Sequence, residues 1–169
     1  VQMRIAGATK FPRAMAFGAT GDPQLAYEAG KVVGTEARAL GVHVNFAPVA
    51  DVNNNPRNPV INTRSFGGDP AAVGRLVAAA VRGTQSAGMW ATAKHFPGHG
   101  DTSADSHLEL PLVEHPVERM REVEFLPFRA AIEAGVARLI APQAMGSRFK
   151  AIGVRSAGLP PLPGFPVKG

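Results

Sequence analysis

The sequence contains no cysteine, and only one tryptophan and one tyrosine occur among its 169 residues. The absence of cysteine excludes disulfide bonds and thiolate metal sites. No apolar run approaches the roughly 18 residues that a membrane-spanning helix needs. The net charge is +5, but the basic residues are scattered, so we expect neither a nucleic-acid partner nor a membrane span. With 45% hydrophobic and 18% charged residues, the composition is typical of a globular protein.

Three proline-containing dipeptides, at residues 22–23, 69–70 and 115–116, each precede a segment with helical spacing of apolar residues. Asp22 and Asp69 are favourable N-caps, and a proline after the cap suits the first helical position. The pattern predicts helices over residues 25–40, 71–87 and 117–134, each ended by a glycine. Pro127 either kinks the third helix or begins a second one.

A short apolar run follows each predicted helix, at residues 43–47, 89–93 and 138–141. Such runs, bounded by glycine and proline, are typical of buried parallel strands. The order is therefore α/β, with about three helix-strand units and long loops after the strands. Ligands of such folds bind at the carboxyl ends of the strands. We therefore expect the function to lie in residues 48–68 and 96–112.

The second loop begins within KHFPGHGDTSADSH, residues 94–107, which holds three of the five histidines. Lys94 and His95 end a predicted strand, so one of the two side chains points into the ligand-binding mouth. Asp105 stands two residues before His107, and an extended backbone would place both side chains on one side. A carboxylate bonded to one ring nitrogen leaves the other free to exchange protons near neutral pH.

Two other interpretations of these histidines stay open. His99 and Asp101 suit a local role, because such residues commonly bond to backbone in turns. His95 and His99 also have the i, i+4 spacing that suits zinc on a helix, but prolines and glycines between them disfavour a helix. We therefore predict no metal and no cofactor.

The first loop offers Asp51, just past a strand end, and Arg64 in an Arg-Ser-Phe-Gly sequence. A carboxylate and a guanidinium at a strand mouth can hold sugar hydroxyls or an anionic group. The alternative is a solvated loop with Asn-Pro turns.

These segments together resemble glycoside hydrolase family 3. The sequence KHFPGHGDTSADSH is similar to the signature loop of that family, and its Asp-Ser-His ending resembles the bacterial β-N-acetylglucosaminidase (β-hexosaminidase) branch. Residues 42–70 (VHVNFAPVADVNNNPRNPVINTRSFGGDP) and 10–20 (KFPRAMAFGAT) resemble the same branch independently. The resemblance covers residues 1–141, as a partial catalytic domain, and we predict an irregular, basic Gly/Pro-rich tail over residues 142–169.

The resemblance implies a portion of a (β/α)₈ TIM-type barrel that removes terminal β-linked N-acetylglucosamine from cell-wall saccharides with retention, through a covalent glycosyl-enzyme. In this branch the acid/base is a His-Asp dyad, whose positions match His107 and Asp105. The implied sugar-binding positions match Lys94, His95, Arg64 and Asp51.

The sequence departs from the family at the nucleophile. Retaining hydrolysis needs a carboxylate for the covalent step, and the family supplies an aspartate near a later strand. No acidic residue follows Glu133 in this chain. We therefore expect a barrel fragment that is catalytically incomplete alone. A sugar-binding remnant without catalysis and a metal-dependent hydrolase remain as alternatives. The sequence defines neither the compartment nor the oligomeric state.

Overall fold

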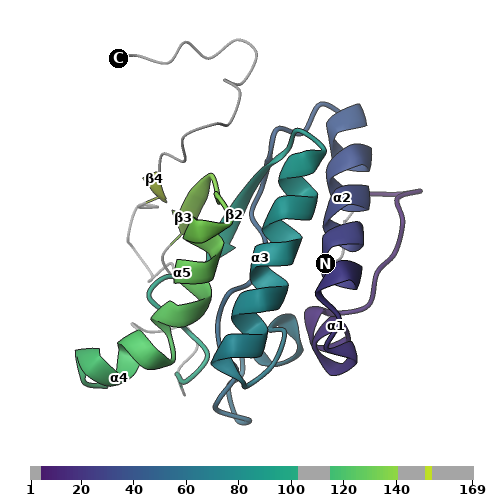
Figure 1. Ribbon diagram of the computed structural model, residues 1–169. Coiled ribbons are helices and arrows are strands. Elements are labelled where there is room, and N and C mark those ends of the chain that lie inside the picture. The colour runs from purple at the N-terminus through teal and green to yellow at the C-terminus, as the bar shows by residue number, and fades with distance from the viewer. Residues whose placement is uncertain (1–4, 103–114, 141–150, 154–169) are drawn as a thin grey trace, which may run out of the picture.

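The computed structural model describes residues 5–102, 115–140 and 151–153, and Figure 1 shows their arrangement. The helix α1 (Ala14–Thr20) and the 3₁₀ turn η1 (Asn62–Arg64) are short. The remaining elements are α2 (Pro23–Ala39), β1 (Val44–Asn45), α3 (Pro70–Ser86), β2 (Trp90–Lys94), α4 (Val117–Glu122), α5 (Phe125–Glu133), β3 (Arg138–Ile140) and β4 (Ala151–Gly153).

The strands form one sheet in the order β1-β2-β3-β4. β1 pairs with β2, and β2 with β3, both in parallel, with Asn45 beside Ala91 and Ala93 beside Leu139. Each of these strands follows a helix, as expected, so the predicted parallel α/β arrangement of three helix-strand units is confirmed.

β4 corrects the prediction that all strands are parallel and that residues 142–169 are irregular throughout. Residues 151–153 pair antiparallel with β3, where Ile140 lies opposite Ala151. The free edge of β3 explains this pairing, because an unpaired strand presents a row of backbone donors and acceptors to any nearby extended segment.

The two predicted aspartate N-caps are confirmed. The Asp22 carboxylate accepts a hydrogen bond from Gln24 N at 2.8 Å, and the Asp69 carboxylate accepts one from Ala72 N at 2.6 Å. In both helices the proline occupies the first turn, where its missing N–H has no helical partner to lose.

The third predicted helix is divided. α4 ends at Glu122 and α5 begins at Phe125, so Pro127 lies in the first turn of a second helix, one of the two predicted outcomes. Unlike the two aspartates, His115 does not cap a helix, because Pro116 is the N-cap of α4.

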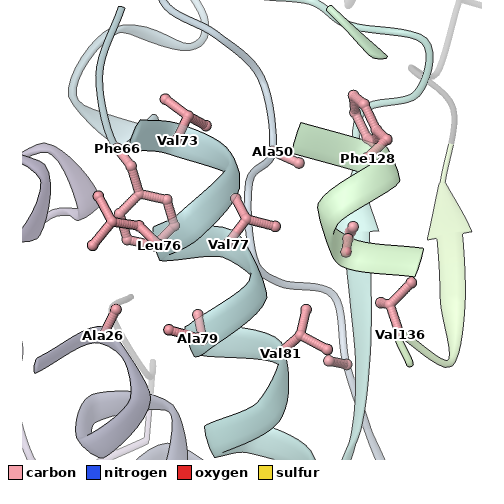
Figure 2. Close-up of a cluster of buried hydrophobic side chains, with 14 of the residues drawn as sticks. Ala26, Ala50, Phe66, Val73, Leu76, Val77, Ala79, Val81, Phe128 and Val136 are labelled. Carbon is pink, nitrogen blue, oxygen red and sulfur yellow. The ribbon is translucent and has the colours of Figure 1, made fainter. Parts of the chain in front are cut away.

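α3 is the central helix of the layer that covers the sheet, between α2 and α5 (Figure 1). Figure 2 shows Phe66 and Leu76 together on the side of α3 that faces Ala26 of α2, whereas Phe128 lies on the opposite side. These residues belong to one buried cluster, in which Phe128 is 1% exposed. None of the helices in the described parts of the chain has the length and apolarity that a membrane crossing requires.

α2 and α3 approach closely because small residues lie at their contact. A Cβ atom on Gly83 would lie 2.0 Å from the backbone oxygen of Tyr27, and one on Gly30 would lie 2.7 Å from that of Ala80. Backbone cannot move aside as a flexible side chain can, so these glycines determine the spacing of the two helices.

The substitution Gly83→Ala should lower the free energy of unfolding by about 1–3 kcal/mol, because the added methyl overpacks the α2–α3 contact. Gly74→Ala on the same helix is the matched control, since its Cβ would meet the side-chain end of Leu126 at 3.2 Å. Urea unfolding of both variants measures the difference. Equal stabilities would contradict this account of the helix contact.

Candidate active site

A buried carboxylate organises the loop that follows β2. Asp51 is 0% exposed, and its Oδ1 accepts hydrogen bonds from the backbone N–H of His95 at 3.1 Å and of His99 at 2.8 Å. Its Oδ2 lies 2.7 Å from Nδ1 of the His95 ring. One side chain from the loop after β1 therefore holds both the backbone and the imidazole at the end of β2.

The amide of Asn58 joins the same two loops. Its Nδ2 lies 2.8 Å from the carbonyl oxygen of His99 and 3.0 Å from that of Thr102, while its Oδ1 accepts from Ile61 N at 2.7 Å. Asn58 is 1% exposed, so the interpretation of residues 48–68 as a solvated loop is wrong at this position, whereas the Asn-Pro turn is present, because Oδ1 of Asn58 also accepts from Val60 N at 2.9 Å. The role of Asn58 in joining the two loops was not predicted, because a buried asparagine and a turn asparagine cannot be told apart in a sequence.

Gly100 allows the two loops to touch. A Cβ atom at this position would lie 1.6 Å from the backbone oxygen of Val52, a distance that no side chain tolerates. Ser65 adds another link, since its hydroxyl donates to the backbone oxygen of Asp51 at 2.6 Å. The loop after β1 and the described part of the loop after β2 are therefore one packed unit.

A cavity of about 380 Å³ opens at the carboxyl end of β1, beside the end of β2. Lys94 and Arg64 both line it, together with the aromatic rings of Phe46 and Phe66. Arg64 is anchored from within its own turn, because its Nη1 donates to the backbone oxygen of Val60 at 3.0 Å. The cavity thus combines cationic donors with apolar surface, as small-molecule sites do.

The cavity environment disfavours the charged form of Lys94. Burial lowers the pKa of Lys94 below its usual value, and the neighbouring Arg64 charge lowers it further, while Asp51 opposes the shift. Both causes act on the ammonium, since low polarity and a like charge each favour the neutral amine.

The structure places the predicted site residues in different surroundings. Lys94 and Arg64 line one cavity. His95 follows Lys94 directly, with its ring bonded to Asp51 and a side-chain exposure of 15%. Asp51 itself is buried and engaged by the loop, which favours a positioning role over direct sugar contact. The predicted acid/base pair, His107 and Asp105, lies outside the described residues.

His99 and Asp101, both expected to bond locally within a turn, have different partners. His99 is buried, and its Nδ1 lies 2.7 Å from the Thr102 hydroxyl within the same turn, in line with the local role expected for it. Asp101 instead pairs with Nε2 of His115 at 2.6 Å, so the prediction of a purely local role for Asp101 is wrong.

Asp101, His115 and Glu124 bring ligand atoms within 4.8 Å of one another, a grouping that a metal ion can use. Arg119 already contacts both carboxylates, Asp101 at 3.5 Å and Glu124 directly. A divalent cation placed there would meet the guanidinium charge. The arrangement is better described as an ion-pair cluster.

Residues 1–148 match the glycosyl hydrolase family 3 N-terminal domain. The chain belongs to glycoside hydrolase family 3. The family predicted from the sequence is therefore confirmed, and its β-hexosaminidase branch agrees with the relatives.

The chain is 47% identical over 130 residues to beta-hexosaminidase A of Pseudoalteromonas piscicida, a match that covers 75% of this chain and 22% of that protein. Its structure is similar to a family 3 beta-N-acetylglucosaminidase of Paenibacillus sp. FPU-7, with a TM-score of 0.81 and 54% identity over 83% of this chain and 27% of that one. Native NagZ of Neisseria gonorrhoeae gives a TM-score of 0.76 and 34% identity, covering 81% of this chain and 42% of that one. The chain thus spans about a fifth of its curated relative.

The substitution Asp51→Asn keeps the side-chain shape but removes the charge that strengthens the bonds from His95 and His99. It should lower the free energy of unfolding by about 2 kcal/mol. Glu133→Gln removes a charge from the exposed end of α5 and should change stability by less than about 0.5 kcal/mol. Denaturant unfolding measures both, and an unchanged Asp51→Asn midpoint would refute the organising role of Asp51.

Arg64→Met should raise the pKa of Lys94, because it removes a like charge, whereas Asp51→Asn should lower it further. Side-chain NMR titration of Lys94 measures both. At a pH between the lowered pKa of native Lys94 and its ordinary pKa in the unfolded chain, the unfolded chain binds more protons than the native chain. The free energy of unfolding therefore rises with pH in this window. A higher pKa of Lys94 in the Asp51→Asn variant would contradict the role assigned to the Asp51 charge.

Proposed function

We propose that this chain forms the sugar-binding part of a glycoside hydrolase that releases terminal β-linked N-acetylglucosamine from cell-wall saccharides. The observation that carries the proposal is the joint placement of Lys94 and Arg64 in one cavity at the strand ends. Several donors around a partly apolar hollow suit a sugar, whose hydroxyls need hydrogen bonds and whose C–H faces pack on aromatic rings.

Each described residue takes a distinct part in the proposal. Lys94 and Arg64 donate hydrogen bonds to the sugar, and His95 does so from the adjoining position. Asp51 holds the His95 ring at 2.7 Å and thereby sets its orientation, as a carboxylate does for a catalytic imidazole. Phe46, 57% exposed, offers an apolar surface to the sugar ring.

The bond-breaking step needs two further groups. His107, steadied by Asp105, would protonate the leaving oxygen as an imidazolium and then activate water as an imidazole. The nucleophilic carboxylate of a retaining mechanism would attack the anomeric carbon. No acidic residue follows Glu133, so we propose that the nucleophile belongs to the part of the relatives that this chain does not span.

The proposed fold of the complete catalytic domain is a (β/α)₈ barrel, of which this chain supplies three parallel helix-strand units. Its three parallel strands β1, β2 and β3, with helices over one face (Figure 1) and the cavity at the carboxyl ends of β1 and β2, are what a barrel segment requires.

Calorimetry with N-acetylglucosamine tests the binding part. The chain should bind the sugar, and Lys94→Met or Arg64→Met should each weaken binding by about tenfold, the loss expected for one charged hydrogen bond. Lys31→Met, on the exposed face of α2, is the control and should bind as the unaltered chain does. Undiminished binding by both cavity variants would overturn the proposal.

The unaltered chain should show negligible hydrolysis of 4-nitrophenyl β-N-acetylglucosaminide. Binding without turnover would agree with a chain that contributes the sugar site but not the nucleophile. Clear turnover would show that the chain contains a nucleophile, and elemental analysis with chelation would then decide whether a metal ion activates water instead.

A further inference from the structure

Glu124 is a buried carboxylate outside the sugar cavity. It is 3% exposed and stands between α4 and α5, as the N-cap residue of α5. Its Oε1 pairs with the guanidinium of Arg119. Its Oε2 is also buried, but has no hydrogen-bond partner among the described residues. An unpaired acceptor at this depth lowers stability, so stability alone does not explain a carboxylate at this position.

The surroundings of Glu124 include both loops that form the candidate site. Its side chain lies against Gly98, where an added Cβ atom would meet Glu124 Cγ at 2.7 Å. Asn54, in the loop after β1, reaches the same ion pair. With its amide oxygen turned toward Arg119, Asn54 accepts a hydrogen bond from Nη2 at 2.9 Å, and its nitrogen donates to the backbone oxygen of Val52 at 3.2 Å. The α4–α5 junction is therefore attached to the strand-end loops.

Arg119 connects Glu124 to a second pair of residues. Its Nη2 lies 3.5 Å from Oδ2 of Asp101, and the same oxygen lies 2.6 Å from Nε2 of His115. Asp101 and His115 flank residues 102–114 in the sequence. The contact between their side chains therefore brings together the two ends of that stretch.

The contact between Asp101 and His115 needs support, because water reaches it. The side chains of Asp101, His115 and Arg119 are 25%, 32% and 33% exposed. Ion pairs with this exposure contribute little and hold no fixed geometry by themselves. Glu124 is the buried member of the cluster, and its charge keeps the guanidinium in one place.

We propose that Glu124 is a positioning residue for the acid/base pair. It fixes the guanidinium of Arg119, which holds the carboxylate of Asp101 at the ring of His115, and so sets the separation of the two ends of residues 102–114. The proposal rests on the proposed function, which assigns the acid/base pair to this stretch.

The ring N–H of His115 measures this arrangement directly. An imidazole N–H that donates to a carboxylate exchanges slowly with water, so it gives its own proton NMR signal in a chain labelled with nitrogen-15. The unaltered chain should show one such signal from His115 and a second from His95, whose Nδ1 lies 2.7 Å from Asp51. Glu124→Gln and Arg119→Gln should each speed exchange of the His115 proton by at least about tenfold and leave the His95 signal unchanged.

Two matched variants control for the loss of charge. Glu122→Gln and Arg121→Gln remove the same charges from exposed positions of α4, and should leave both ring signals unchanged. Calorimetry with N-acetylglucosamine should give Glu124→Gln an affinity within about twofold of that of the unaltered chain, because Glu124 does not line the cavity.

The outcomes separate this proposal from the proposed function. An unchanged His115 signal in Glu124→Gln, or no such signal in the unaltered chain, would overturn the positioning role and leave the sugar site standing. Equal loss of the His95 signal would also overturn it, because Glu124 would then support the whole loop. If Glu124→Gln fails to fold, the partly exposed Arg119→Gln tests the same link. Absence of sugar binding by the unaltered chain would instead overturn the proposed function, and with it the assignment of an acid/base pair.

Discussion

The carboxylate of Asp51, buried between two loops, accepts bonds from the backbone of His95 and His99 and contacts the His95 ring. Because the charge is withdrawn from water, it stabilises the fold only while these donors surround it. Residues 95–99 must therefore follow one path, which sets where Lys94 enters the cavity. Asn58 and Gly100 support that path, one by hydrogen bonds to carbonyls and the other by permitting close approach. The candidate site depends on this arrangement.

The helices and parallel strands could be predicted because their signals are local. Asp22 and Asp69 cap helices through bonds to residues two and three positions ahead, and apolar runs after the helices give β1, β2 and β3. The joint placement of Lys94 and Arg64 was also predictable, since Lys94 ends one parallel strand and Arg64 lies in the loop that follows the neighbouring one.

The tertiary roles of individual polar residues were not predictable. Asn58 reads as a turn asparagine, yet it bonds to a loop more than 40 positions away. Asp101 reads as a turn cap, yet its partner is His115 on a separate segment. Asp51 stands at the predicted strand end, but its burial and its loop-holding bonds follow from the packing of two loops. β4 pairs with an edge that only the assembled sheet creates.

Within the resulting site, Lys94 and Arg64 line the cavity, while the Asp51 carboxylate is engaged by the His95 ring. Family membership and this charge pattern together support a sugar site whose catalytic carboxylate lies elsewhere. Two-dimensional amide NMR spectra recorded during titration with N-acetylglucosamine test this account most directly. Among the described residues, it predicts shifts confined to residues 13–14, 45–49, 64–66 and 94–100. Shifts centred instead on the Asp101–His115–Glu124 cluster, or no shifts at saturating sugar, would contradict it.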